Sequence, residues 1–330
     1  MTMMKAAISY GSSQRLVIEE RPIPRLAAGD VLVQVERCGI CGSDLRTRKG
    51  APRLHPAGHI LGHEYSGRIV DVGADVEMAR IGERIAAYPG AGCGDCPACR
   101  NDHPILCPNG RHVMGGFAEY AAMPASCAVP LPEGFDPAEG ALVEPLAVGR
   151  YAVRCAAIRA GDPVLIIGAG TIALAVIYWA RRMGAGQITV LSRSDRRAPA
   201  AQRFGADRVV AFNNIDDLGD KPAAVFECTG APGLLQQAID LGAFASRVVS
   251  LGSSPLPEPI APASAGRKAV TLHFPIGYTT GDFVETATTL HHGNVDVREM
   301  VSNVVPLDAL PDVFETLLAP NRQNKVQVAL

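Results

Sequence analysis

The stretch Pro163-Val-Leu-Ile-Ile-Gly168-Ala-Gly170-Thr171-Ile172-Ala173 decides the fold of the second half of this chain. An apolar run leads into a glycine turn, and a helix-length segment without charge follows it. Gly168 permits the tight turn and Gly170 lets the backbone approach a pyrophosphate, whose negative charge is favoured by the helix N-terminus. The spacing G-x-G-x-x-A therefore predicts a strand, a turn and a helix that bind a dinucleotide through Gly168, Gly170, Thr171 and Ile172.

Short apolar runs recur after this turn and are separated by helix-length spacers. They are Ile188–Leu191, Val209–Phe212, Ala224–Phe226 and Val248–Leu251. This alternation is typical of βαβ units on a parallel sheet. Since a dinucleotide lies at the carboxyl edge of such a sheet, we expect the loops after the later strands to bring Thr229, Gly252 and Ser253 to it.

The residues that follow the run Ile188–Leu191 indicate which dinucleotide is bound. An acidic residue there would bind both ribose hydroxyls of NAD, but the sequence has Ser192 and Arg193 instead. Arg193 can bind a 2′-phosphate in a bidentate contact, Ser192 can donate a hydrogen bond, and Arg196 and Arg197 add positive potential. We therefore predict NADP(H) rather than NAD(H). The alternative is a solvated basic turn, with Asp195 as the ribose acid of an NAD enzyme.

The first 130 residues contain short β segments instead. Asp30–Glu36, Gly67–Gly73 and Arg84–Tyr88 are rich in β-branched residues or bounded by glycine and proline. This pattern favours a small antiparallel barrel. The chain becomes helical again near Gly281, and its last residues, Lys325–Leu330, have the pattern of a closing strand.

Four cysteines lie within fifteen positions, with the spacing C-x2-C-x2-C-x7-C. They are Cys93, Cys96, Cys99 and Cys107. Four thiolates satisfy a tetrahedral Zn²⁺ and leave no open position, so we predict a structural zinc site. An iron–sulfur cluster, a redox dithiol and unrelated core thiols are the alternatives. A nucleic-acid zinc ribbon is disfavoured because the segment carries few basic residues.

A second group of candidate metal ligands is spread along the chain. Cys41 follows a predicted strand, His63 and Glu64 come about twenty residues later, and Glu144 lies far downstream. A thiolate, an imidazole and a carboxylate are ligands that a catalytic zinc uses, with one position open for water or substrate. Spacing alone leaves another interpretation open, in which Cys41 and His63 are buried core residues and the glutamates lie at the surface.

Composition limits the class of protein. The chain has 330 residues, enough for two domains, and its 48% hydrophobic and 19% charged residues exclude general disorder. A net charge of −2 gives no electrostatic reason to expect nucleic acid or a membrane surface as a partner. Nine cysteines without a secretory signal point to a reducing compartment, so we expect a cytoplasmic protein.

Five motifs in order carry a resemblance to a known family. They are GICGSD (39–44), GHE (62–64), the four-cysteine loop, VEPLAVG (143–149) and the glycine turn at 168. Together they resemble the zinc-dependent medium-chain dehydrogenases, in particular the sorbitol and threonine dehydrogenase branch, over nearly the whole chain. The resemblance implies an α/β protein with a GroES-like barrel domain at residues 1–148 and 287–330. A Rossmann dinucleotide-binding domain would occupy residues 149–286.

The resemblance also implies roles for single residues. Cys41 and His63 would ligate the catalytic zinc, with Glu64 as a third ligand and Glu144 binding the metal directly or through its water. Asp44 would fix the tautomer of His63, and Ser43 would contact the substrate oxygen and relay its proton.

The expected activity is hydride transfer between a secondary alcohol or polyol and NADP(H), with two zinc ions per chain, in a homodimer or homotetramer. Three alternatives stay open: an NAD-linked polyol dehydrogenase, a zinc-free reductase or lyase on the same scaffold, and a non-enzymatic zinc-binding scaffold protein.

Overall fold

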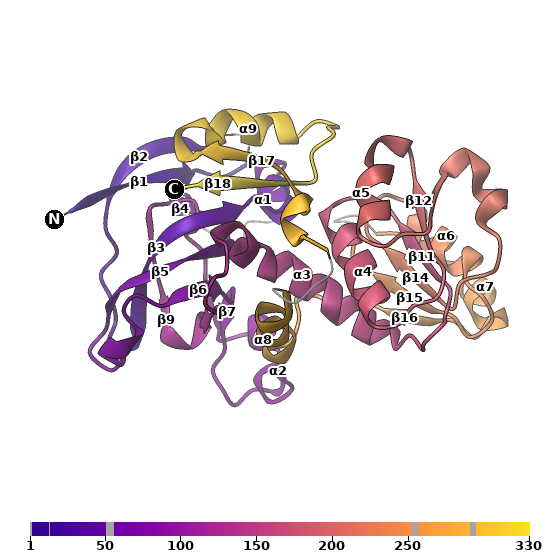
Figure 1. Cartoon of the computed structure of the whole chain (residues 1–330), viewed down its shortest axis with the longest axis horizontal. Coiled ribbons are helices and arrows are strands. Elements are labelled where there is room, and N and C mark those ends of the chain that lie inside the picture. Colours follow the sequence, from indigo (N-terminus) through magenta and orange to yellow (C-terminus); the bar gives the residue numbers. More distant parts are fainter. Residues whose placement is uncertain (1, 13, 51–55, 253–256, 291–294) are drawn as a thin grey trace. The chain divides into compact units, whose positions relative to one another are not determined.

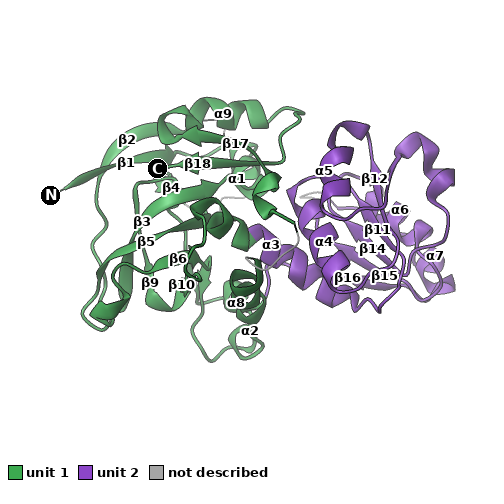
Figure 2. Ribbon diagram, viewed as in Figure 1, with its two compact units in different colours: residues 1–144, 279–330 green, residues 145–278 purple. Residues whose placement is uncertain are grey.

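The structure is a computed structural model, and it describes residues 2–12, 14–50, 56–252, 257–290 and 295–330. The chain forms two compact units, one of residues 1–144 and 279–330 and one of residues 145–278 (Figure 2). The first unit therefore ends four residues before the expected boundary at 148, and it resumes eight residues before the expected 287. The first of these boundaries lies inside helix α3 (Pro137–Ala156).

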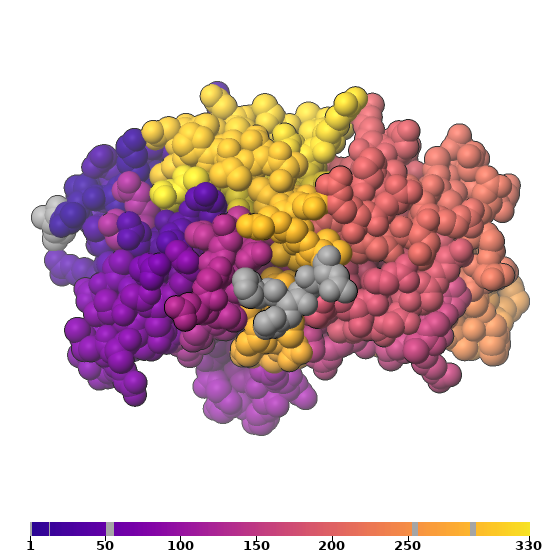
Figure 3. Space-filling view, in the orientation of Figure 1, coloured from indigo at the N-terminus to yellow at the C-terminus, as the bar shows by residue number. Residues whose placement is uncertain are grey.

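Unit 1 is built mainly from β-strands. Its larger sheet has the order β10 (Ala128–Pro130), β6 (Arg84–Ala87), β5 (Glu64–Val72), β3 (Asp30–Gly39), β18 (Lys325–Ala329) and β17 (Val301–Pro306), with β9 (Tyr120–Pro124) also paired to β3. Two smaller sheets are formed by β2 (Val17–Pro22), β1 (Met3–Ser9) and β4 (His59–Ile60), and by β7 (Gly90–Ala91) and β8 (Arg111–His112). The N-terminal strands and the C-terminal segment share one face of this unit (Figure 3).

The strand pairs of unit 1 are antiparallel, as expected from the sequence, with one exception. Strands β17 and β18 run parallel. A parallel pair needs a crossover connection, and helix α9 (Leu310–Leu317) lies between the two strands in the chain. The other helices of unit 1 are short: α1 (Gly42–Arg48), α2 (Pro97–Arg100) and α8 (Thr280–Thr289).

Strand β3 is the centre of unit 1 because β5, β9 and β18 all pair with it. Val31, Val33 and Val35 are buried on it, which accounts for its alternating sequence. Its register with β5 places Gly39 opposite Glu64. A side chain at Gly39 would lie 2.1 Å from a Glu64 carboxylate oxygen, so any larger residue there would displace that carboxylate.

Unit 2 contains a parallel sheet, as the sequence predicted, with five strands at the predicted runs and a sixth, β16 (Thr271–His273), that was not predicted (Figure 1). Its order is β13 (Arg208–Ala211), β12 (Ile188–Ser192), β11 (Val164–Ile167), β14 (Ala224–Glu227), β15 (Arg247–Ser250) and β16 (Thr271–His273). The connecting helices are α4 (Thr171–Arg182), α5 (Ala198–Arg203), α6 (Leu234–Leu241) and α7 (Pro262–Arg267). The strand order changes direction between β11 and β14, where an open sheet of this kind binds its ligand.

Helix α4 explains the long uncharged segment of the sequence. Residues 173–180 are all buried, because the helix packs on the sheet and other parts of unit 2. Gly149 lets α3 approach it closely, since a side chain at that position would come within 2.6 Å of Ala175. Among the described residues, no helix has both the length and the apolar character that crossing a bilayer requires.

Candidate active site

Cys41, His63 and Glu64 come together at one end of strands β3 and β5. One ligand atom from each lies within 4.8 Å of the other two. Cys41 comes two residues after β3, and His63 immediately precedes β5, so the pairing of the two strands brings the three residues together. Glu64 is fully buried, whereas Cys41 and His63 are partly exposed. A thiol, an imidazole and a carboxylate at this spacing fit a zinc ion with one face open.

Helix α1 fixes the orientation of Cys41. Cys41 is the N-cap of the helix, and its sulfur accepts a hydrogen bond from the backbone N–H of Ser43 at 3.5 Å. The Asp44 carboxylate in turn accepts from the backbone N–H of Cys41 at 3.0 Å. The cap therefore presents the sulfur from the first turn of the helix, and Ser43 lies partly exposed beside it.

Asp44 also lies beside His63, with 3.7 Å between Oδ1 and Nδ1. Burial disfavours the charged imidazolium, but the Cys41 sulfur and the Asp44 carboxylate outweigh that effect and hold the pKa of His63 well above its ordinary value. A carboxylate on Nδ1 leaves Nε2 of a neutral imidazole available as a metal ligand. The 3.7 Å separation is that of an ion pair and is longer than a hydrogen bond, so the tautomer-fixing role of Asp44 stays a prediction.

Lys325 is a residue of this site that the sequence analysis missed. Its ammonium group donates to both carboxylate oxygens of Glu64, at 2.7 and 2.5 Å, and to the carbonyl of Ile40 at 3.1 Å. Lys325 is 3% exposed and Glu64 is 1% exposed, so the ion pair is buried. Burial opposes the charge of the ammonium, but Glu64 and Cys41 outweigh it and raise the pKa of Lys325. The only sequence signal was a lysine at the start of an apolar strand.

Glu144 stands apart from the three clustered ligands. It is buried in α3, and its charge helps to raise the pKa of Lys325. In the part of the chain that the structure describes, however, the metal-binding group contains Cys41, His63 and Glu64 and does not include Glu144. Of the two glutamates, Glu64 is therefore the better placed to be a third ligand.

The four-cysteine loop forms a second, closed group. The ligand atoms of Cys93, Cys96, Cys99 and Cys107 all lie within 4.8 Å of one another. The sulfur of Cys96 is 3.5 Å from that of Cys99 and 3.7 Å from that of Cys107. A tetrahedral site with Zn–S bonds of about 2.3 Å has sulfur–sulfur edges of about 3.8 Å. The spacing suits a zinc ion and is far too long for disulfides.

The glycine turn of unit 2 has the form expected for a phosphate-binding turn. Gly168 has a φ of +108°, and a side chain there would lie 2.8 Å from the Thr229 methyl group. Gly170 is the N-cap of α4, so Thr171 and Ile172 form the first turn of that helix. Around Gly170 there is room for a ligand, since the nearest atom to a side chain there would be a guanidinium nitrogen of Arg197, at 3.5 Å.

Basic residues lie beside this turn. Ser192 is the last residue of β12, and Arg193 follows it at the carboxyl edge of the sheet. Burial, together with the nearby charge of Arg193, lowers the pKa of Arg197. Two guanidinium groups close enough to repel each other are suited to binding a group with about two negative charges, such as a phosphate monoester.

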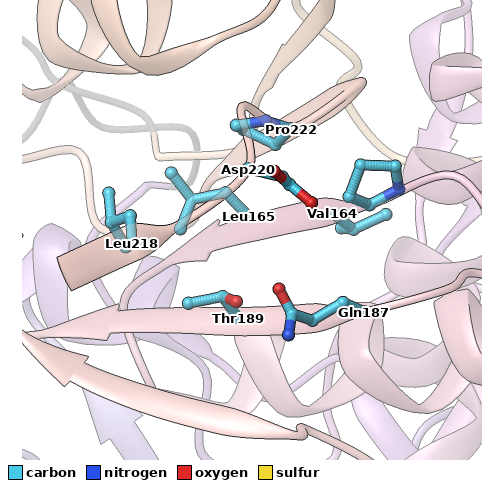
Figure 4. A pocket seen from close by; sticks show the side chains of 8 residues that line it. Val164, Leu165, Gln187, Thr189, Leu218, Asp220 and Pro222 are labelled. Atoms are coloured by element: carbon cyan, nitrogen blue, oxygen red, sulfur yellow. The ribbon is translucent and has the colours of Figure 1, made fainter.

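Thr229 and Gly252 lie in loops at the same edge, as predicted, whereas Ser253 lies outside the described residues. Glu227, the last residue of β14, was missed because an acid at the end of an apolar strand is common. A small pocket lined by residues such as Gln187 and Asp220 lies at the opposite, amino-terminal edge of the sheet (Figure 4). It is therefore not part of the predicted dinucleotide site.

Comparison with known proteins agrees with these features. Residues 27–133 match the alcohol dehydrogenase GroES-like domain, and residues 171–292 match the zinc-binding dehydrogenase domain. The (R,R)-butanediol dehydrogenase of Bacillus subtilis (strain 168) is 32% identical over 98% of this chain and 99% of its own length. The chain belongs to the zinc-dependent medium-chain dehydrogenase family. It is therefore a zinc-type alcohol or polyol dehydrogenase that acts on CH–OH groups.

Other relatives of this dehydrogenase differ in the activities and ligands by which they are named. The L-galactonate-5-dehydrogenase of Escherichia coli (strain K12) is 28% identical over 94% of each chain. A crystal structure of a zinc-binding dehydrogenase from Sinorhizobium meliloti, bound to NADP, has a TM-score of 0.92 with 29% identity over 100% of both chains. The rspB structure from E. coli, complexed with NADH, also has a TM-score of 0.92, with 27% identity over 100% of both chains.

Proposed function

We propose that this dehydrogenase interconverts a secondary alcohol or polyol and its ketone, with NADP(H) as the preferred dinucleotide and NAD(H) as a possible one. The juxtaposition of Cys41, His63 and Glu64 carries the proposal, because it supplies three zinc ligands with a partly exposed face. Cys93, Cys96, Cys99 and Cys107 would hold a second, structural zinc. Their closed arrangement leaves no position for a substrate.

The residues around Cys41 would have different roles in the proposed reaction. When bound, zinc supplies a Lewis acid that lowers the pKa of an alcohol, and the dinucleotide carries the hydride. Asp44 would keep His63 in the tautomer that presents Nε2. Ser43, in the first turn of α1, would accept the proton of the substrate hydroxyl while it passes its own proton to water. Lys325 neutralises Glu64, so a carboxylate can lie at the site without an uncompensated buried charge.

The proposal also includes the cellular location of the protein and its oligomeric state. None of the nine cysteines, all of which the structure describes, forms a disulfide, and four of them form the closed group suited to zinc. Thiols in this form are stable in a reducing compartment, which supports a cytoplasmic location. The resemblance to sorbitol-type dehydrogenases supports a homodimer or homotetramer, which analytical ultracentrifugation of the purified protein would distinguish.

The activity is tested by a panel of substrates followed at 340 nm. Zinc-loaded protein is mixed with each of NADP⁺ and NAD⁺ and with simple secondary alcohols, polyols and amino alcohols. We expect turnover of at least one secondary alcohol, with higher kcat/KM for NADP⁺. Binding of neither dinucleotide would support the zinc-binding scaffold instead, and higher kcat/KM with NAD⁺ would support the NAD-linked alternative.

Replacing Arg193 with alanine tests the 2′-phosphate contact. Because a charge-assisted bidentate contact would be lost, we expect the Kd for NADP⁺ to rise by about tenfold and that for NAD⁺ to change by less than about twofold. Fluorescence titration with each dinucleotide measures both values. The control is Arg15→Ala, which removes a surface arginine of unit 1. Equal losses of affinity for the two dinucleotides would reject the contact.

A further inference from the structure

Glu227 is a buried residue of unit 2 that has no role in the reaction proposed above. It is 2% exposed at the carboxyl end of β14. One carboxylate oxygen accepts hydrogen bonds from the backbone N–H of Thr229 at 2.7 Å, the hydroxyl of Thr229 at 2.5 Å and the backbone N–H of Gly230 at 2.9 Å. The other oxygen lies 3.2 Å from the same Gly230 nitrogen. The loop after β14 is thus folded tightly around this carboxylate.

The negative charge of Glu227 is held by these donors rather than by a cation. Within the described ranges of the chain, Glu227 forms no ion pair with lysine, arginine or histidine. A buried carboxylate is costly unless hydrogen bonds satisfy it, and backbone N–H donors to a charge are among the stronger ones. The hydrogen bonds that satisfy this carboxylate therefore fix the conformation of residues 228–230.

Three loops at the carboxyl edge meet at this point. A side chain at Gly252, after β15, would lie 1.9 Å from the Gly230 nitrogen and 2.4 Å from a Glu227 oxygen. A side chain at Gly168, after β11, would lie 2.8 Å from the Thr229 methyl group. The backbone carbonyl of Glu227 also accepts from the N–H groups of Leu251 and Gly252. A shift of the loop held by Glu227 would therefore disturb the two loops next to it.

The order of the strands shows which half of a dinucleotide these loops face. The adenosine ribose belongs at the end of β12, where Ser192 and Arg193 lie, and the pyrophosphate belongs at the turn after β11. Strands β14 and β15 lie on the other side of β11, so the nicotinamide half extends over them. We propose that Glu227 is a positioning residue that shapes the loop 228–230 for the nicotinamide half, an inference that rests on the dinucleotide function proposed above.

Two variants and a truncated ligand test this role. In Glu227→Gln the side-chain amide has one acceptor, and its NH2 group faces the N–H of Gly230. In Glu227→Asp the charge stays but the carboxylate retracts by one methylene. We expect each to raise the Kd for NADP⁺ by about tenfold while the Kd for 2′,5′-ADP, which lacks the nicotinamide half, changes by less than about twofold. Fluorescence titration gives the first value and competition gives the second.

A matched control separates positioning from general loosening of unit 2. Asp162 also accepts from a backbone N–H, that of Arg159 at 2.9 Å, and it pairs with Arg247 at 2.9 Å, but it precedes β11 and these contacts lie at the amino-terminal edge of the sheet. We expect Asp162→Asn to leave both affinities within about twofold of wild type. Equal weakening of NADP⁺ and 2′,5′-ADP by the Glu227 variants would overturn the inference, as would no weakening of either.

Failure of the inference and failure of the proposed function are distinguishable. If the wild-type protein prefers NAD⁺, the test uses NAD⁺ in place of NADP⁺ and ADP in place of 2′,5′-ADP. A selective rise in the Kd for NAD⁺ in the Glu227 variants then supports the inference, and equal rises or no rise overturn it. If wild type binds neither dinucleotide, the proposed function fails and the role of Glu227 fails with it. If Glu227→Gln does not fold, Glu227→Asp alone gives the result, since it keeps the buried negative charge but moves the carboxylate away from the donors in residues 229 and 230.

Discussion

Replacement of Cys41 by serine is expected to reduce kcat by at least about a thousandfold, because it removes a ligand from the group that would bind the catalytic zinc. A serine hydroxyl is not ionised near neutral pH and is a poor zinc ligand, whereas a thiolate binds zinc strongly. Steady-state turnover and the zinc content per chain are measured together. We expect one zinc per chain to remain, held by the four-cysteine loop.

The control for this variant is another cysteine of similar exposure. Cys155 is half-buried in α3 and belongs to neither metal-binding group, so Cys155→Ser should keep both zinc ions and most of the activity. Full turnover by Cys41→Ser with two zinc ions per chain would show that Cys41 is not a ligand. Loss of both zinc ions would instead show that the substitution had disrupted the fold of unit 1, which circular dichroism would detect.

The parts of the fold that follow from local sequence were predicted well. The glycine turn at Gly168 and the apolar runs after it indicated the parallel sheet, since each run lies within one residue of a strand of that sheet. The pairing of β17 with β18 could not be predicted, because it depends on where the chain returns after α9 rather than on either strand's own pattern. Strand β16 was missed for a similar reason: its three residues carry no clear alternation.

In the candidate site, too, residues in local motifs could be predicted, whereas residues brought in by long-range contacts could not. Cys41, His63 and the four-cysteine loop belong to short motifs with informative spacing, so the sequence indicated them directly. Lys325 is 261 residues away from Glu64 in the chain, and no local pattern links the two. Glu227 binds residues only two and three positions ahead, but its role depends on its burial, which the sequence does not show.

The second large effect is expected on stability and concerns the buried ion pair between Lys325 and Glu64. Replacement of Lys325 by methionine is expected to lower the free energy of unfolding by about 3 kcal/mol or more, because it leaves the Glu64 carboxylate buried without its cation. Urea or guanidinium unfolding of both proteins gives this difference. Lys5→Met is the control, since Lys5 pairs with Asp308 at the surface, where solvent screens the pair, and its loss should cost far less stability. A loss from Lys325→Met no larger than that of the control would contradict the prediction.

The same variant also distinguishes the two glutamates as zinc ligands. If Glu64 binds the catalytic zinc, the metal supplies a positive charge to the stranded carboxylate, so Lys325→Met should destabilise the metal-free protein more than the zinc-loaded protein. If Glu144 binds the zinc alone, the cost should be nearly equal in both forms. Adding Glu64→Gln to Lys325→Met should recover much of the lost stability of the metal-free protein, because the unpaired charge is then gone. No recovery would mean that Lys325 stabilises the fold through contacts other than its pairing with Glu64.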